Sequence, residues 1–153
     1  MITSLRAVAA DKLLFELRDT LVSALGAPVD RVDNPRATLA GMEVHRFRRD
    51  AWEFVIYFDG DRSHRVIISK QDGSTMDHQE IARFLMPNKS HNSWREWKLP
   101  DRRAWVSEGK IGPFYALVAS DSRALELITY RYIVDLGRQV WLDSTEASTT
   151  KQP

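Results

Sequence analysis

The sequence contains no cysteine, which excludes disulfide bonds, thiolate metal sites, iron–sulfur clusters and cysteine nucleophiles. It also lacks any apolar run approaching the roughly 20 residues that a membrane-spanning helix requires. Its N-terminus does not combine a short apolar block with a small-residue cleavage site, as a secretory signal would. From these absences we expect a soluble, cytoplasmic protein that does not enter a membrane.

The common catalytic and nucleotide-binding motifs are missing as well. There is no GxSxG elbow, no Walker loop and no GxGxxG turn, so activated-serine, P-loop and dinucleotide-binding functions have no support. The segment Ser107–Gly112 superficially resembles a phosphate loop, but it lacks the ending in which lysine and then serine or threonine follow a glycine. A hairpin turn explains it better. We expect no enzymatic activity and no cofactor.

Histidines are few and badly spaced for metal binding. None of them stands at HxH, HxxxH or HExxH spacing, and the sequence has only His45, His64, His78 and His91. His45 and His64 could meet across neighbouring strands, with Asp59 or Asp61 near the turn. Histidines at such positions are more often ordinary surface residues, so we predict no metal site and keep a small metal-dependent hydrolase as a third alternative.

Charge of one sign is not in excess over the whole chain. The 22 basic and 21 acidic residues give a formal net charge of +1, so no strong overall field draws in polyanions. Basic residues do outnumber acidic residues between positions 81 and 110. Any electropositive patch should centre on that segment.

The length of the chain, 153 residues, suits one domain with one core. No internal repeat is present. The last ten residues are rich in serine and threonine, a composition typical of disorder. We predict a single domain over residues 1–143 and a disordered polar tail over 144–153.

The first long segment predicts a helix. Ser4–Leu25 contains no glycine or proline and ends at Gly26-Ala27-Pro28, which is a typical stop signal. Its apolar residues form two stripes on a helical wheel, wider together than a surface helix needs; they are Val8, Phe15 and Val22, and Leu14, Leu17, Leu21 and Leu25. Such a helix could contact two surfaces, so we predict that the protein forms a homo-oligomer through it.

After a loop over Gly26–Arg36, the chain alternates between strand and turn signals. The predicted strands are Met42–Phe47, Trp52–Phe58, Arg65–Ser69, Ser93–Leu99, Arg103–Glu108 and Pro113–Ala119. The first three should form an antiparallel meander whose middle strand is apolar on both faces and therefore central. A second helix is predicted over Met76–Leu85, capped by Thr75 or Asp77 and stopped by Pro87.

Residues 121–136 are ambiguous. Ser120-Asp121 and Gly137 favour a helix, whereas Ile128–Val134 is rich in β-formers and could continue as a hairpin into Val140–Leu142. We favour the helix. The predicted fold class is α+β, with a single antiparallel sheet of about 5–6 strands flanked by an N-terminal, a middle and a C-terminal helix.

The most informative segment is 94–105, where three of the five tryptophans lie among basic residues. Because side chains alternate along a strand, a hairpin here would pair Leu99 with Ala104 and Trp97 with Val106, and would turn this apolar face to the core. The opposite face would carry Trp94, Glu96, Lys98, Arg103 and Trp105. Indoles among charges are typical of a binding surface, although the C-terminal segment could instead cover Trp94 and Trp105.

We therefore predict a non-enzymatic module that binds another protein, of the chaperone, inhibitor or immunity, or assembly-adaptor type. The candidate binding residues are Trp94, Lys98, Arg102, Arg103 and Trp105. The main alternative is a nucleic-acid-binding protein that uses Arg95, Lys98, Arg102 and Arg103, since aromatics between basic residues also bind single strands.

Overall fold

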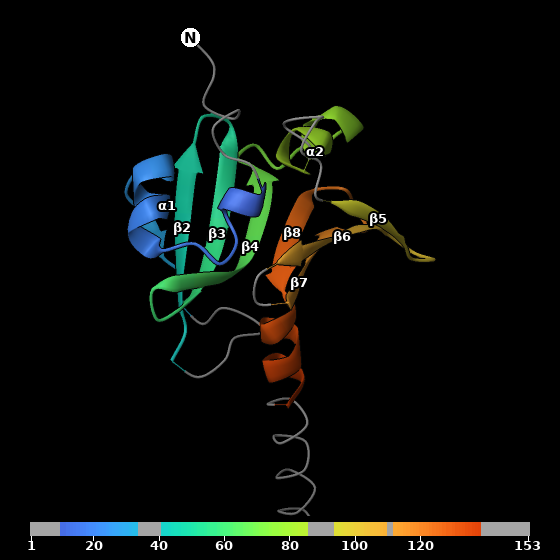
Figure 1. Ribbon diagram of the computed structural model, residues 1–153. Coiled ribbons are helices and arrows are strands. Elements are labelled where there is room, and N and C mark those ends of the chain that lie inside the picture. Colours follow the sequence, from blue (N-terminus) through green and yellow to red (C-terminus); the bar gives the residue numbers. More distant parts are fainter. Residues whose placement is uncertain (1–9, 34–40, 86–93, 110–111, 139–153) are drawn as a thin grey trace, which may run out of the picture.

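A computed structural model describes residues 10–33, 41–85, 94–109 and 112–138, and these form one eight-stranded antiparallel sheet with helices packed against it (Figure 1). The strand order is β1-β2-β3-β4-β8-β7-β6-β5. Each half of the sheet is a meander of consecutive strands, and β4 and β8 join the two halves. The first half comprises β1 (Asp30–Arg31), β2 (Glu43–Arg49), β3 (Trp52–Asp59) and β4 (Arg62–Lys70). The second comprises β5 (Arg95–Lys98), β6 (Arg103–Gly109), β7 (Gly112–Val118) and β8 (Ala124–Thr129).

The α+β class and the single antiparallel sheet are confirmed, but the predicted strand number was too low. All six predicted strands are present, including the central β3 between β2 and β4. The two additional strands are β1, which lies in the predicted loop, and β8, which lies in the predicted C-terminal helix. A two-residue strand leaves almost no periodic signal, so β1 is not visible in the sequence pattern.

The prediction of a continuous first helix was wrong. The described part of that segment holds a short 3-10 helix, Ala10–Lys12, and the helix α1, Arg18–Leu25. Between them Phe15 adopts a positive φ of 56°, and the backbone follows β4 instead. Phe15 N–H donates to the carbonyl of Ser63, and Ser63 N–H donates to the carbonyl of Glu16.

Ser63 explains why the break is stable. Its side chain is fully buried, and its hydroxyl donates to the carbonyl of Leu13 while accepting from the N–H of Glu16. Backbone groups that a helix would have satisfied are thus satisfied by a strand that is far away in sequence. The same bend accounts for the wide apolar arc of this segment. Leu14 lies before the bend and Leu21 after it, and both side chains pack in the core of this chain. The arc therefore no longer argues for an oligomer through this helix.

Residues 121–136 contain both of the structures considered for them. Ala124–Thr129 forms β8, and residues 130–138 are helical. The change occurs at Thr129, whose hydroxyl accepts the N–H of Tyr132 and so caps the helix. Leu125 and Leu127 are completely buried between two neighbouring strands, and this sheet environment overrides the helical signal. The alternative hairpin partner, Val140–Leu142, and the predicted tail lie outside the described residues.

The second helix was predicted correctly. It is α2, His78–Leu85, and it begins with reciprocal bonds between Asp77 and Glu80. The carboxylate of Asp77 accepts the N–H of Glu80, and the carboxylate of Glu80 accepts the N–H of Asp77, which is a capping box. The described helices include none that is both long and apolar enough to cross a membrane.

Helices α1 and α2 pack on one face of the sheet, which we call the covered face. Its side chains in β3 are Trp52, Phe54, Ile56 and Phe58, all buried with residues of α1 and α2 in one core. The other face, which we call the open face, is defined by Val55, Arg65, Ile67, Glu126, Tyr115, Leu117 and Trp97. These residues are half-buried or exposed. Helical residues 130–138 pack on one end of the open face through Tyr132, whose ring lies 6.3 Å from that of Tyr57.

Candidate functional site

The β5–β6 hairpin pairs in a register two residues away from the predicted one. Trp97 lies opposite Ala104, and Glu96 lies opposite Trp105. Since a shift of two residues keeps every side chain on its side, the predicted division of the hairpin into two faces is correct. The predicted orientation of those faces is wrong. Trp94 and Trp105 are only 3% and 6% exposed, whereas Trp97 is 43% exposed.

The orientation follows from the position of Trp105 in the sheet. Its cross-strand neighbours form a row through the centre of the covered face, consisting of Ala116, Leu127, Val66 and Ile56. All four are completely buried, so Trp105 is the last side chain of a continuous core row. Of the charged neighbours that suggested a binding surface, Glu96 lies opposite Trp105, whereas Lys98 and Arg103 lie nearer the tip of the hairpin. All three are exposed.

Trp97 therefore stands on the open face. Its neighbours along the row are Ala104, Leu117, Glu126 and Ile67. Its ring lies 5.4 Å from the ring of Tyr115 on β7. An exposed tryptophan beside the half-buried apolar side chains of Tyr115 and Leu117 is the arrangement expected of an interaction surface.

A cavity of about 250 Å³ lies on the same face, near the centre of the sheet. Its lining is mixed: Ser120, Glu126 and Arg102 supply polar groups, and the aliphatic residues are Ile67, Leu117, Ala119 and Ala124. Arg102 reaches the cavity from the β5–β6 turn, so the hairpin contributes a cation to a site built mostly by β4, β7 and β8.

Glu126 in this cavity is held by Arg65. The Arg65 Nε atom lies 2.8 Å from Glu126 Oε1, and the guanidinium lies over the Tyr57 ring at 4.8 Å. Burial alone would lower the pKa of Arg65, but the adjacent carboxylate of Glu126 more than offsets it, so that the pKa is raised. The Arg65 guanidinium is therefore charged at neutral pH, and it holds the Glu126 side chain that lines the cavity in an ion pair.

The five predicted binding residues do not share one surface. Trp94 and Trp105 are in the core. The Arg103 guanidinium lies over the Trp105 ring at 5.1 Å, and its Nη2 atom lies 2.6 Å from His78 Nδ1. Lys98 is exposed opposite Arg103 on the covered-face side. Only Arg102 lies at the cavity.

Sequence reasoning missed the residues of the open face. Trp97 was assigned to the core because Leu99 and Val106 share its side of the hairpin. Glu126 was placed in a helix, where its alternation with Leu125 and Leu127 goes unnoticed. The apolar character of both faces of β3 was the available signal, since it indicates a sheet with something to bind on its second face.

The cations of the nucleic-acid alternative are divided between the two faces. Arg95 and Arg102 lie on the open-face side, whereas Lys98 and Arg103 lie on the other. Carboxylates also lie near two of them, Glu108 at 3.5 Å from Arg95 and Asp101 at 3.9 Å from Arg102. This arrangement does not build the continuous basic groove that a nucleic-acid backbone would follow.

The histidines considered for a metal site have separate partners. His45 Nε2 lies 3.2 Å from Glu43 Oε2, and His64 Nδ1 lies 3.1 Å from Thr129 Oγ1. His45, Asp59 and His64 do not form a group able to hold a metal ion, and neither does any other set of three such side chains in the described ranges. His91 lies outside those ranges.

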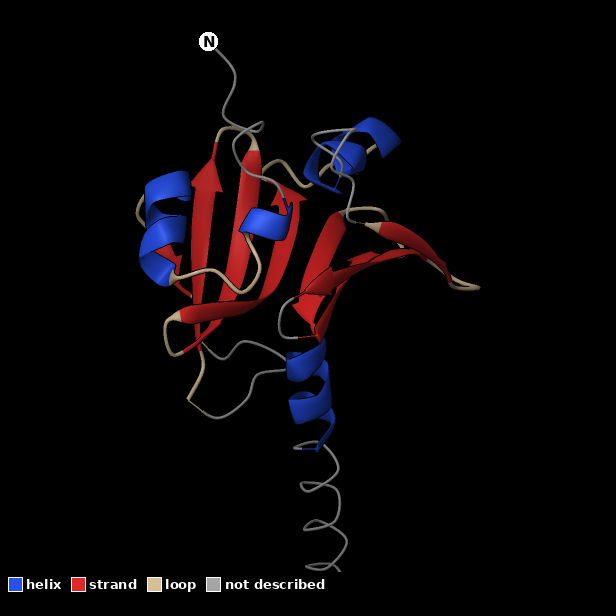
Figure 2. Cartoon of the chain, viewed as in Figure 1, coloured by secondary structure: helices blue, strands red, loops and turns tan. Residues whose placement is uncertain are grey.

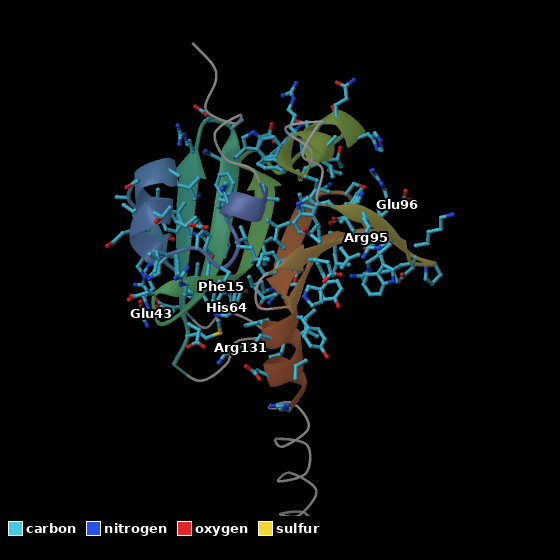
Figure 3. All side chains as sticks on the ribbon, viewed as in Figure 1. Phe15, Glu43, His64, Arg95, Glu96 and Arg131 are labelled. Carbon is cyan, nitrogen blue, oxygen red and sulfur yellow. The ribbon has the colours of Figure 1, made fainter. Side chains whose placement is uncertain are left out.

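His64 should make stability depend on pH. It is 6% exposed and contacts the Phe15 ring (Figure 3). Burial is the largest cause that lowers its pKa, Arg131 lowers it further, and Asp59 and Asp135 act in the opposite direction. The unfolded chain binds this proton near pH 6.5 and the folded chain only at lower pH. The free energy of unfolding should therefore fall as the pH decreases through about 6.5.

The measurement is urea unfolding at pH 7.5 and 5.5 for the native chain and for His64→Gln. The two proteins differ only at position 64, so the comparison isolates His64. The native chain should lose more stability between the two pH values than the variant. An equal loss in both proteins would contradict the prediction.

No protein-family model matches the sequence, and no curated protein matches it. Among solved structures, the chain is similar to a cysteine-rich secretory protein from Staphylococcus aureus subsp. aureus Mu50, with 12% sequence identity and a TM-score of 0.49. The similarity covers 83% of this chain and 48% of that protein, so this chain spans about half the length of its neighbour. So distant a likeness assigns neither a family nor a function.

Proposed function

We propose that this chain is a non-enzymatic module that binds another protein through the open face of its sheet. The observation that carries the proposal is the exposure of Trp97, 43%, on a face that also carries the half-buried side chains of Tyr115 and Leu117 and a cavity. Tryptophan is the residue most enriched among those that dominate binding energy at protein interfaces.

The cavity favours a side chain of a partner over a free small molecule. Its volume of about 250 Å³ is below the roughly 300–1,000 Å³ of typical small-molecule sites. Ile67, Leu117, Ala119 and Ala124 give it an apolar part that suits an apolar side chain. Arg102, whose side chain is 42% exposed, adds a cation at the rim. The partner that fits is a protein segment with an apolar residue followed by a carboxylate.

Binding of this kind serves a chaperone, an inhibitor or an assembly adaptor equally well. In each case the partner would lie across β4, β8 and β7 and would contact the β5–β6 hairpin at Trp97 and Arg102. The role within these classes depends on the partner.

The test is affinity capture from the native source with the full chain and with Trp97→Ala. Leu17→Ala is the matched control, because Leu17 is also 43% exposed but lies outside the open face. A partner of this face should be retained by the control and weakened by Trp97→Ala by about 30-fold in Kd, which corresponds to about 2 kcal/mol for a dominant interface residue. Arg102→Ala should weaken the same partner.

The proposal fails if every captured protein binds Trp97→Ala and the native chain equally well. Thermal unfolding of each variant serves as the control for folding. Both substitutions remove exposed side chains, so their midpoints should remain close to that of the native chain.

A further inference from the structure

Strand β5 forms one edge of the sheet and is exposed along its whole length. All four side chains of Arg95–Lys98 are exposed. Among the strands that the structure describes, β5 pairs only with β6. The tip of the hairpin extends beyond the rest of the sheet (Figure 2), and Figure 3 shows Arg95 and Glu96 on the hairpin. The outer side of β5 therefore carries backbone groups that can accept a further strand.

The charges on β5 restrict which strand can be added. Arg95 and Trp97 point to the open face, and Glu96 and Lys98 point to the covered face, because side chains alternate. Charged residues at an edge usually discourage pairing. Here, however, a carboxylate and an ammonium group flank Trp97 at equal distances along the strand and on the same side of the sheet.

This symmetry makes β5 complementary to itself. Two identical antiparallel strands can be related by a two-fold axis perpendicular to the sheet. The open faces of the two copies then lie on the same side of the joined sheet. With such an axis, one residue of the strand lies opposite the same residue of the second copy. An axis at Trp97 places Glu96 opposite Lys98 of the second copy, and Lys98 opposite Glu96 of the second copy. The two tryptophans then lie opposite each other on the open face.

Every other axis position within β5 is unfavourable. An axis at Arg95, Glu96 or Lys98 brings two like charges directly opposite each other, which is destabilising in a sheet. The sequence thus selects a single register. We propose that two copies of this chain associate through their β5 strands in that register and form one continuous sheet.

The proposed dimer explains the exposed position of Trp97. Pairing would cover part of its ring with the Trp97 ring of the second copy, and cross-strand aromatic pairs are stabilising. The dimer contact uses the edge of the sheet and not its open face, so dimerisation does not depend on the proposed function. A dimer would nevertheless make the two open faces continuous.

A charge-reversal series tests the dimer. The full chain is measured by sedimentation equilibrium over the micromolar to millimolar range, together with Glu96→Lys, Lys98→Glu, the double variant and an equimolar mixture of the two single variants. Each single variant turns both ion pairs into like-charge pairs. It should therefore weaken dimerisation by about tenfold or more.

The double variant and the mixture should both recover the dimer. In the double variant each lysine at position 96 faces a glutamate at position 98. In the mixture the two lysines of one chain face the two glutamates of the other, so two poorly associating proteins should form a heterodimer. Asp33→Lys, a reversal at an exposed residue outside β5, is the control and should not change the native dimer.

Three results would overturn the proposal. The native chain could be a monomer at every concentration. The single variants could dimerise as well as the native chain, which would place any interface elsewhere. The mixture could remain monomeric although both variants unfold at the native thermal midpoint.

Discussion

Replacing Trp105 with alanine is expected to lower the free energy of unfolding by about 3–5 kcal/mol, the range for removing a buried aromatic side chain. Trp105 is 6% exposed and closes the row of buried side chains that runs through the covered face. Its removal leaves a cavity next to Ala116 that small neighbours cannot fill. For a chain of this length, the thermal midpoint should fall by roughly 10 °C.

Trp97→Ala is the matched control for this experiment. The two indoles lie on the same hairpin, but Trp97 is 43% exposed and contacts mainly the Tyr115 ring. Its loss should cost less than about 1 kcal/mol, which is typical of substitutions outside the core. Urea unfolding of both variants gives the comparison. Equal stability losses, or a larger loss for Trp97→Ala, would show that the hairpin faces are assigned the wrong way round.

These two tryptophans also show what the sequence can and cannot determine. Alternation along a strand divides the hairpin correctly, because a register shift of two residues preserves the faces. Alternation does not say which face meets the core. That depends on the strands that continue the sheet beyond β6, which are β7 and then β8, and β8 was expected to be a helix.

The meander from β2 to β4 was predictable for the opposite reason. Its strands are consecutive, and β3 shows a continuous alternation from Trp52 to Phe58 that local turns join to its neighbours. The capping box of α2 is equally local, since Asp77 and Glu80 are three residues apart. Elements whose stabilising contacts lie nearby in the chain leave a readable pattern.

The break in the first helix and the formation of β8 depend on distant contacts. The break is fixed by Ser63, about fifty residues away, and β8 by β4 and β7 on its two sides. Local propensity favours a helix in both segments, and tertiary hydrogen bonds and burial override it. The cavity of the open face could not be predicted for the same reason, because β4, β7, β8 and the hairpin turn all contribute to it.

The ion pair between Arg65 and Glu126 should give the second large effect. The two side chains are only 15% and 28% exposed, and they sit diagonally on adjacent strands. Glu126→Ala leaves the Arg65 guanidinium partly buried without its carboxylate. Removing one partner of such a pair destabilises a protein strongly, and hydrogen bonds to charged groups contribute about 1.5–3 kcal/mol. We expect a loss of about 2–3 kcal/mol.

Replacing both partners should be less harmful than replacing one. The double variant Arg65→Met with Glu126→Leu removes both charges and keeps most of the side-chain volume, and apolar replacements of buried ion pairs are often neutral. The free energy of unfolding of the double variant should therefore lie closer to the native value than the free energy of unfolding of Glu126→Ala does. Denaturant unfolding with an unchanged m-value provides the measurement.

The alternative outcome has a distinct meaning. If the stability loss of the double variant relative to the native chain equals the sum of the losses of Glu126→Leu and Arg65→Met, the two residues act independently. The stacking of Arg65 on Tyr57 would then carry most of its contribution. If each single variant is less stable than the double variant, the main role of each charge is to compensate the charge of the other residue. Glu126 is then held beside the cavity by the ion pair, because a partly buried Arg65 without a carboxylate partner would destabilise the fold.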